Sequence, residues 1–155
     1  MKSIKQTAKR PLRRCGAALV EAAFVIPAFL LLILGMLDFG MVTLNRNNLS
    51  AAAIRLCRAA ILHGEKSAPE RTPWGPAIYQ GTAATGDEVA NVIKPYLVMM
   101  KPSDVQIRVE WPDASNALGK RVQVTVSYEQ KLICTGLFGA APWTQQAVSA
   151  MRIQH

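Results

Sequence analysis

One junction decides the fold of this chain: Arg13-Arg14-Cys15-Gly16-Ala17-Ala18-Leu19-Val20-Glu21. A basic leader, residues 1–16, ends there, and an apolar segment runs from Ala17 to Leu37. That segment has about the length at which an α-helix crosses a bilayer. A single acid, Glu21, lies inside it. An ionisable side chain at the centre of a bilayer costs about 2.5–3.5 kcal/mol or more, so Glu21 is a candidate functional residue.

The net charge of +8 is concentrated in the leader. Six basic residues and no acid precede the apolar segment, whereas the remainder of the chain has 12 basic and 10 acidic residues. Basic residues beside an apolar span are explained by the positive-inside rule, which predicts a cytoplasmic N-terminus and an exported C-terminal domain. The charge therefore argues for membrane lipid as a partner and against nucleic acid.

A cleaved secretory signal is the competing explanation of this N-terminus. Such signals have apolar regions of about 7–15 residues, followed closely by a small-x-small cleavage site. Here the apolar segment is longer and contains Pro27, and the first Ala-x-Ala lies far beyond it at 51–53. We therefore predict a retained transmembrane helix over residues 17–37 and an extracytoplasmic domain over residues 38–155.

The helix is predicted to continue beyond the membrane. Apolar residues recur every three or four positions, which is the pattern of one buried helix face, and His63-Gly64 provides an end. These residues are Leu49, Ala52, Ala53, Leu56, Ala60 and Ile61. Pro and Gly punctuate residues 64–86, which predicts a loop. A short helix is expected from Asp87-Glu88 to about Met99, although Pro95 could split it.

The C-terminal third alternates apolar and polar residues, which is typical of half-buried strands. Strands are predicted at 105–111 and 122–128, joined as an antiparallel hairpin, with a third at 147–153. Residues 132–142 have a loop-like composition. The predicted fold class is α+β, with a long N-terminal membrane helix that continues as an amphipathic helix and packs on a small antiparallel sheet.

The three cysteines are Cys15, Cys57 and Cys134. None forms a C-x-x-C pair, which argues against zinc. Cys15 precedes the apolar region, whereas the cysteine of a lipobox follows it. Cys57 and Cys134 would both be exported, so they are either a disulfide in an oxidising compartment or two small buried hydrophobic residues.

No constellation of residues predicts catalysis or a cofactor. The histidines are His63 and the last residue, His155, and there is no phosphate-binding loop or dinucleotide fingerprint. A nucleophile pair of Cys57 and His63 would be six residues apart on one helix, a poor angular match. We therefore expect a non-enzymatic protein with no metal and no cofactor.

From Arg13 to Pro27 the chain resembles the TadE-like family of minor pseudopilins. These proteins belong to the tight-adherence (Flp, type IVb) pilus and secretion systems of bacteria. The resemblance rests on Gly16, on Glu21 five residues later, and on Pro27 inside the apolar span. It extends through the Arg/Ala-rich helix that ends near Gly64 and is looser after that.

The resemblance implies a type IV prepilin-like signal, with cleavage after Gly16 by a membrane-embedded prepilin peptidase. Ala17 would become the new N-terminus, and Glu21 the fifth residue of the mature chain. A buried carboxylate favours a charged partner, and the new α-amine of this subunit or a neighbour is the natural candidate. The alternative for Glu21 is that it reaches to the cytoplasmic interface without a partner.

Two functional hypotheses follow. In the first, the chain is a minor pseudopilin of the bacterial inner membrane, which acts in pilus assembly, secretion and adhesion beside other pseudopilins and pilus-assembly membrane proteins. In the second, it is a signal-anchored envelope protein that is not cleaved at Gly16 and whose periplasmic domain binds a partner.

Overall fold

The computed structural model describes residues 14–139 and 141–154. The chain divides into two compact units, one ending at Leu37 and the other beginning at Asp38. Residues 1–13 of the predicted leader lie outside the described residues. The α+β fold class is confirmed, because a long apolar N-terminal helix and an antiparallel sheet account for most of the regular structure.

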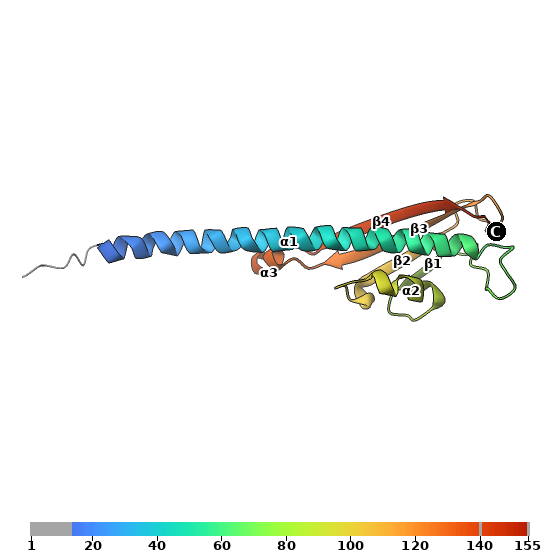
Figure 1. The fold of residues 1–155 in the computed structure, drawn as a ribbon, viewed down its shortest axis with the longest axis horizontal. Coiled ribbons are helices and arrows are strands. Elements are labelled where there is room, and N and C mark those ends of the chain that lie inside the picture. Colours follow the sequence, from blue (N-terminus) through green and yellow to red (C-terminus); the bar gives the residue numbers. More distant parts are fainter. Residues whose placement is uncertain (1–13, 140, 155) are drawn as a thin grey trace, which may run out of the picture. The chain divides into compact units, whose positions relative to one another are not determined.

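Helix α1 runs from Arg14 to Leu62 with Pro27 inside it. It begins three residues before the predicted start at Ala17, so the end of the leader is helical. Arginine has a high helix propensity, which is consistent with a helix that starts at Arg14. It ends one residue before His63-Gly64, as the glycine predicted. The part of α1 in the second unit lies along one face of the sheet (Figure 1).

The sheet has four antiparallel strands in the order β1-β2-β3-β4. The strands are β1 (Tyr79–Thr82), β2 (Val105–Glu110), β3 (Arg121–Gln130) and β4 (Trp143–Arg152). The hairpin between β2 and β3 is confirmed, with Ile107 opposite Val126. Strand β4 pairs with β3 along its whole length, from Arg152 opposite Arg121 to Trp143 opposite Gln130, so it begins four residues before the predicted start.

The core lies between α1 and the inner face of the sheet. The apolar helix face predicted from periodicity is buried there, with Ile61 only partly so, and the alternate residues of β2 and β3 meet it. These strand residues are Val105, Ile107, Val109, Val122, Val124 and Val126. Burying a side chain of this size contributes about 1.5–3 kcal/mol, which makes this interface the main source of stability in the second unit.

Two segments predicted as loops contain regular structure, and the helix expected after the first of them is split at Pro95, as the sequence allowed. The predicted loop 64–86 contains β1, a four-residue strand too short to show alternation and held by pairing with β2. The helix expected up to Met99 is divided into α2 (Glu88–Ile93) and a 3₁₀ turn (Lys94–Tyr96), because Pro95 cannot continue the α-helical hydrogen bonds. A second 3₁₀ turn, Pro102–Asp104, precedes β2. Residues 132–142, predicted as a loop, include the short helix α3 (Ile133–Phe138).

Candidate functional site

The residues at the predicted processing junction all lie in α1. Gly16, Ala17 and Glu21 are exposed, and a Cβ atom added at Gly16 would meet no atom within 4 Å. Glu21 follows Ala17 by four residues, so both lie on the same side of the helix, about 6 Å apart along its axis. Nothing in the described part of the chain covers the Gly16–Ala17 peptide or holds the Glu21 carboxylate by a hydrogen bond or ion pair.

The apolar segment of α1 has no protein partner among the described residues. Its large side chains are exposed around the whole circumference of the helix, as expected of a helix surrounded by lipid. Among the described residues, one helix, α1, is long and apolar enough to cross a membrane; the part that qualifies is Gly16–Leu62, and the mean hydropathy of its apolar window is 2.5. The exposed residues in the segment include Leu19, Phe24, Ile26, Phe29, Leu32, Met36 and Leu37.

Asp38, the first residue after the apolar segment, is buried and fully engaged. Its carboxylate accepts hydrogen bonds from the backbone N–H groups of Ile133 and Cys134, each at 2.8 Å. These are the first residues of α3, whose initial N–H groups have no partner within that helix. An acid nearly one hundred residues earlier in the chain therefore caps α3 and ties it to α1.

These contacts change the acidity of both partners. The hydrogen bond from the backbone N–H of Cys134 is the main cause that holds the pKa of Asp38 below its usual value, and the bond from Ile133 adds to it. Burial acts in the opposite direction. The hydrogen bond to Asp38 raises the pKa of the Cys134 thiol, and burial raises it further.

The structure does not join Cys57 and Cys134, and both are free thiols. Cys57 is fully buried and directs its Sγ at the carbonyl oxygen of Val122, 3.8 Å away. The backbone N–H of Cys134 is bound to Asp38, and Asp38 lies 19 residues before Cys57 on α1. The two cysteines are therefore roughly 28 Å apart along the axis of α1. A disulfide needs Cα atoms within about 7 Å, so the possible disulfide is not formed, and Cys57 is a small buried hydrophobic residue.

At the far end of α1, a loop folds back on the helix terminus. The His63 ring stacks on Trp74 at 4.2 Å, and its Nδ1 lies 2.8 Å from the carbonyl oxygen of Thr72. Glu88 accepts hydrogen bonds from Trp74 Nε1 and Thr72 Oγ1. These contacts are structural, because every group is used in closing the loop.

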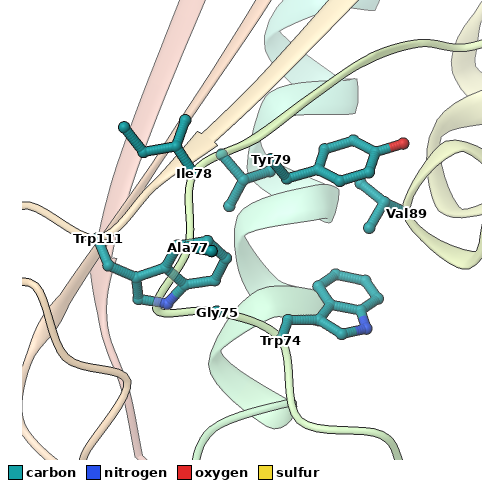
Figure 2. A pocket seen from close by; sticks show the side chains of 8 residues that line it. Trp74, Gly75, Ala77, Ile78, Tyr79, Val89 and Trp111 are labelled. Carbon is teal, nitrogen blue, oxygen red and sulfur yellow. The ribbon is translucent and has the colours of Figure 1, made fainter.

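A small apolar pocket of about 230 Å³ lies beside this loop. In Figure 2, Trp74 and Trp111 lie on either side of Gly75, with Ile78 and Tyr79 above them. The buried Nε1 of Trp111 has no hydrogen-bond partner in the described structure. The lining carries no carboxylate, histidine or thiol; its one phenol, that of Tyr79, donates a hydrogen bond to Asp87 Oδ2 at 3.0 Å.

Among the described residues, no group of three or more His, Cys, Asp or Glu side chains could hold a metal ion. Sequence reasoning missed Asp38 as a structural acid, although its position directly after the apolar segment was a usable signal. It also missed three buried polar residues near that end of the second unit: Asn45, Gln130 and Gln145. Gln145 Nε2 donates to Gln130 Oε1 at 2.6 Å.

The fold and the junction define a class of protein: an α+β domain carried on one long, apolar N-terminal helix. A family model described as TadE-like protein matches residues 16–55. The resemblance to the TadE-like family is thereby confirmed for the segment that holds Gly16, Glu21 and Pro27. No curated protein and no solved structure matches the chain.

Proposed function

We propose that this chain is a minor pseudopilin, a non-enzymatic component of a Flp, or tight-adherence, pilus assembly or secretion system. Similarity to the TadE-like family indicates a protein associated with the Tad pilus. The one long apolar helix indicates a single-pass membrane anchor. The observation that carries the proposal is the placement of Gly16, Ala17 and Glu21 within the matched segment 16–55.

The proposed processing step is hydrolysis of the peptide bond between Gly16 and Ala17 by a prepilin peptidase. Water adds across the bond, which leaves a carboxylate on Gly16 and a free α-amine on Ala17. The leader then departs with the six basic residues that favour a cytoplasmic N-terminus. The junction is exposed and uncovered, which supports its access to a peptidase in the membrane.

The new α-amine would lie one helical turn from Glu21. A cation and a carboxylate held in a medium of low dielectric attract strongly, whereas either group alone is expensive there. Within one subunit, or between two, this ion pair would stabilise the processed helix in an assembly. The unprocessed helix has no α-amine at Ala17 and could not form the pair.

The test compares Gly16→Leu with Gly40→Leu in cells that contain the cognate peptidase. Both glycines have open space where a Cβ would lie, and both are in α1, so neither change disturbs a described contact. We expect wild type and Gly40→Leu to yield a chain that starts at Ala17, and Gly16→Leu to remain full length. Intact mass and N-terminal sequencing measure this.

A wild-type chain that keeps Met1 while it is fixed in the membrane would reject the pseudopilin proposal. That result would favour the alternative, an uncleaved signal-anchored envelope protein with a partner-binding periplasmic domain. A start near Ile54 would instead indicate ordinary signal-peptide cleavage.

A further inference from the structure

A second apolar surface lies next to the end of the proposed membrane span. Residues 132–143 contain no charged side chain, and the flanking residue Lys131 is an exposed cation. In this stretch Trp143 is 57% exposed and Ile133 is 52% exposed, and Phe39, which follows Asp38 on α1, is 73% exposed. We call Phe39, Ile133 and Trp143 the basal apolar surface.

The Asp38 contact fixes the level of this surface along α1. Asp38 follows Leu37 directly, one helical rise of about 1.5 Å further along the axis. Because its carboxylate accepts hydrogen bonds from the N–H groups of Ile133 and Cys134 at 2.8 Å, the start of α3 lies beside Asp38, the first residue of the second unit. Phe39 is one residue further along α1.

The same end of the unit has a groove of about 550 Å³, lined in part by Phe39, Trp143 and Arg46. Arg46 is exposed and has no acidic partner in the described structure. The nearby acid, Asp38, is already used by α3. Aromatic side chains are enriched at the boundary between hydrocarbon and headgroups, and unpaired cations near it are attracted to lipid phosphates.

We propose that the basal apolar surface is a lipid contact: Phe39, Ile133 and Trp143 lie in the interfacial layer of the same bilayer that α1 crosses. The inference rests on the proposed membrane span at residues 17–37. Irregular backbone is tolerated near hydrocarbon only where its polar groups are satisfied, and Asp38 satisfies the first N–H groups of α3. The domain therefore has two membrane attachments, one spanning and one interfacial.

Trp143 gives a direct probe, because the other tryptophans lie far from this end. Trp74 donates its backbone N–H to His63, which is 25 residues beyond Asp38 and roughly 37 Å further along α1. Trp111 lines the same pocket as Trp74. Only Trp143 is therefore within reach of a quencher carried by lipid acyl chains.

The experiment reconstitutes the full-length protein into vesicles of phosphatidylcholine with some phosphatidylglycerol. The phosphatidylcholine is either unmodified or brominated on its acyl chains. We expect bromination to quench part of the tryptophan fluorescence of wild type and of Trp74→Phe. Trp143→Phe should lose nearly all of that quenching. Equal quenching in Trp143→Phe and wild type, or none in wild type, would overturn the proposal.

A second pair of variants tests the surface without removing the probe. Ile133→Gln should reduce the quenching of Trp143, because a buried amide opposes insertion of α3 into the interface. Val148→Gln is the matched control, since Val148 is 55% exposed on β4 but is not part of the basal apolar surface. The quenching of Trp143 in this variant should equal that in wild type. Equal quenching in both variants would show that Ile133 does not contact lipid.

Extraction with alkaline carbonate separates this inference from the proposed function. Protein that carbonate releases from the vesicles has no membrane span, which overturns both proposals. Protein that resists carbonate but shows no quenching of Trp143 keeps the span and overturns only the lipid contact.

Discussion

At the scale of single residues, Glu21 carries the strongest functional prediction. Glu21→Gln keeps the size of the side chain and removes its charge, so insertion of the helix should become easier while the proposed pairing with an α-amine is lost. We expect normal cleavage after Gly16 but failure to co-purify with other pseudopilins and failure to restore pili in a deletion strain.

The matched variant is Glu21→Asp, which retains the charge on a shorter side chain. It should assemble better than Glu21→Gln if charge is what matters. Full complementation by Glu21→Gln would show that the carboxylate is merely tolerated at the interface, and would favour the envelope-protein alternative.

Replacement of Gly75, even by alanine, should destabilise the fold. Its φ of +84° is unfavourable for other residues, and a Cβ there would overlap the ring of Trp111. Gly86 has a similar φ, +79°, with nothing within 4 Å. Gly75→Ala should therefore reduce the free energy of unfolding by roughly 1–3 kcal/mol more than Gly86→Ala, the cost of overpacking a core.

Urea unfolding of the full-length protein in mild detergent, followed by tryptophan fluorescence, measures this difference. Because the two changes share the cost of a positive φ, only the clash with Trp111 separates them. Equal loss of stability in both variants would mean that the Trp111 ring moves aside freely.

At the scale of elements, the attachment of α3 to α1 depends on one carboxylate and on pH. The pKa of Asp38 is lowered in the folded protein, so ionised Asp38 stabilises the fold above the ordinary carboxyl pKa of 3.8. As the pH falls from there through the lowered pKa, that contribution is lost. Asp38→Asn should remove this acid dependence, because an amide does not titrate in this range. It should also weaken the cap of α3, because an amide presents one acceptor oxygen where the carboxylate presents two.

Hydrogen exchange at the amides of Ile133 and Cys134 measures the effect at neutral pH. We expect faster exchange in Asp38→Asn than in wild type. Asp113→Asn is the control: Asp113 accepts a hydrogen bond from the backbone N–H of Arg121 at the other end of β3. If α3 exchanges at the same rate in wild type and Asp38→Asn, the cap does not hold α3.

At the scale of the whole molecule, the uneven charge predicts orientation. Six basic residues precede the span, and its other flank has Asp38 and Arg46 nearby. The positive-inside rule therefore predicts that the domain from residue 38 onward is exported. An enzyme that is active only in the periplasm should work when fused after His155, and one that works only in the cytoplasm should not.

Neutral replacement of the six basic residues is the control, since it removes the charge difference without touching the span or the domain. Without that charge difference, we expect fusion proteins in both orientations, with a smaller share that exports its C-terminus. A cytoplasmic reporter that is active after His155 in the unaltered protein would refute the predicted topology.

The sequence by itself determined the long helix, the hairpin of β2 and β3, and the junction at Gly16. Each depends on a pattern that is local in the chain: an unbroken apolar segment, an alternation over six or seven residues, or a change from basic to apolar at one glycine. Such local patterns predict structure because the residues that form them belong to the same helix or strand, independently of distant parts of the chain.

Only the tertiary structure decided the role of Asp38, the existence of β1 and α3, and the state of the cysteines. The hydrogen bond from the backbone N–H of Ile133 to the Asp38 carboxylate joins residues 95 positions apart, and no periodicity in the sequence indicates such a contact. Strand β1 is held by hydrogen bonds to β2 and not by its own composition. The separation of Cys57 from Cys134 follows from where Asp38 holds α3, because distance between distant residues is set by packing and not by sequence.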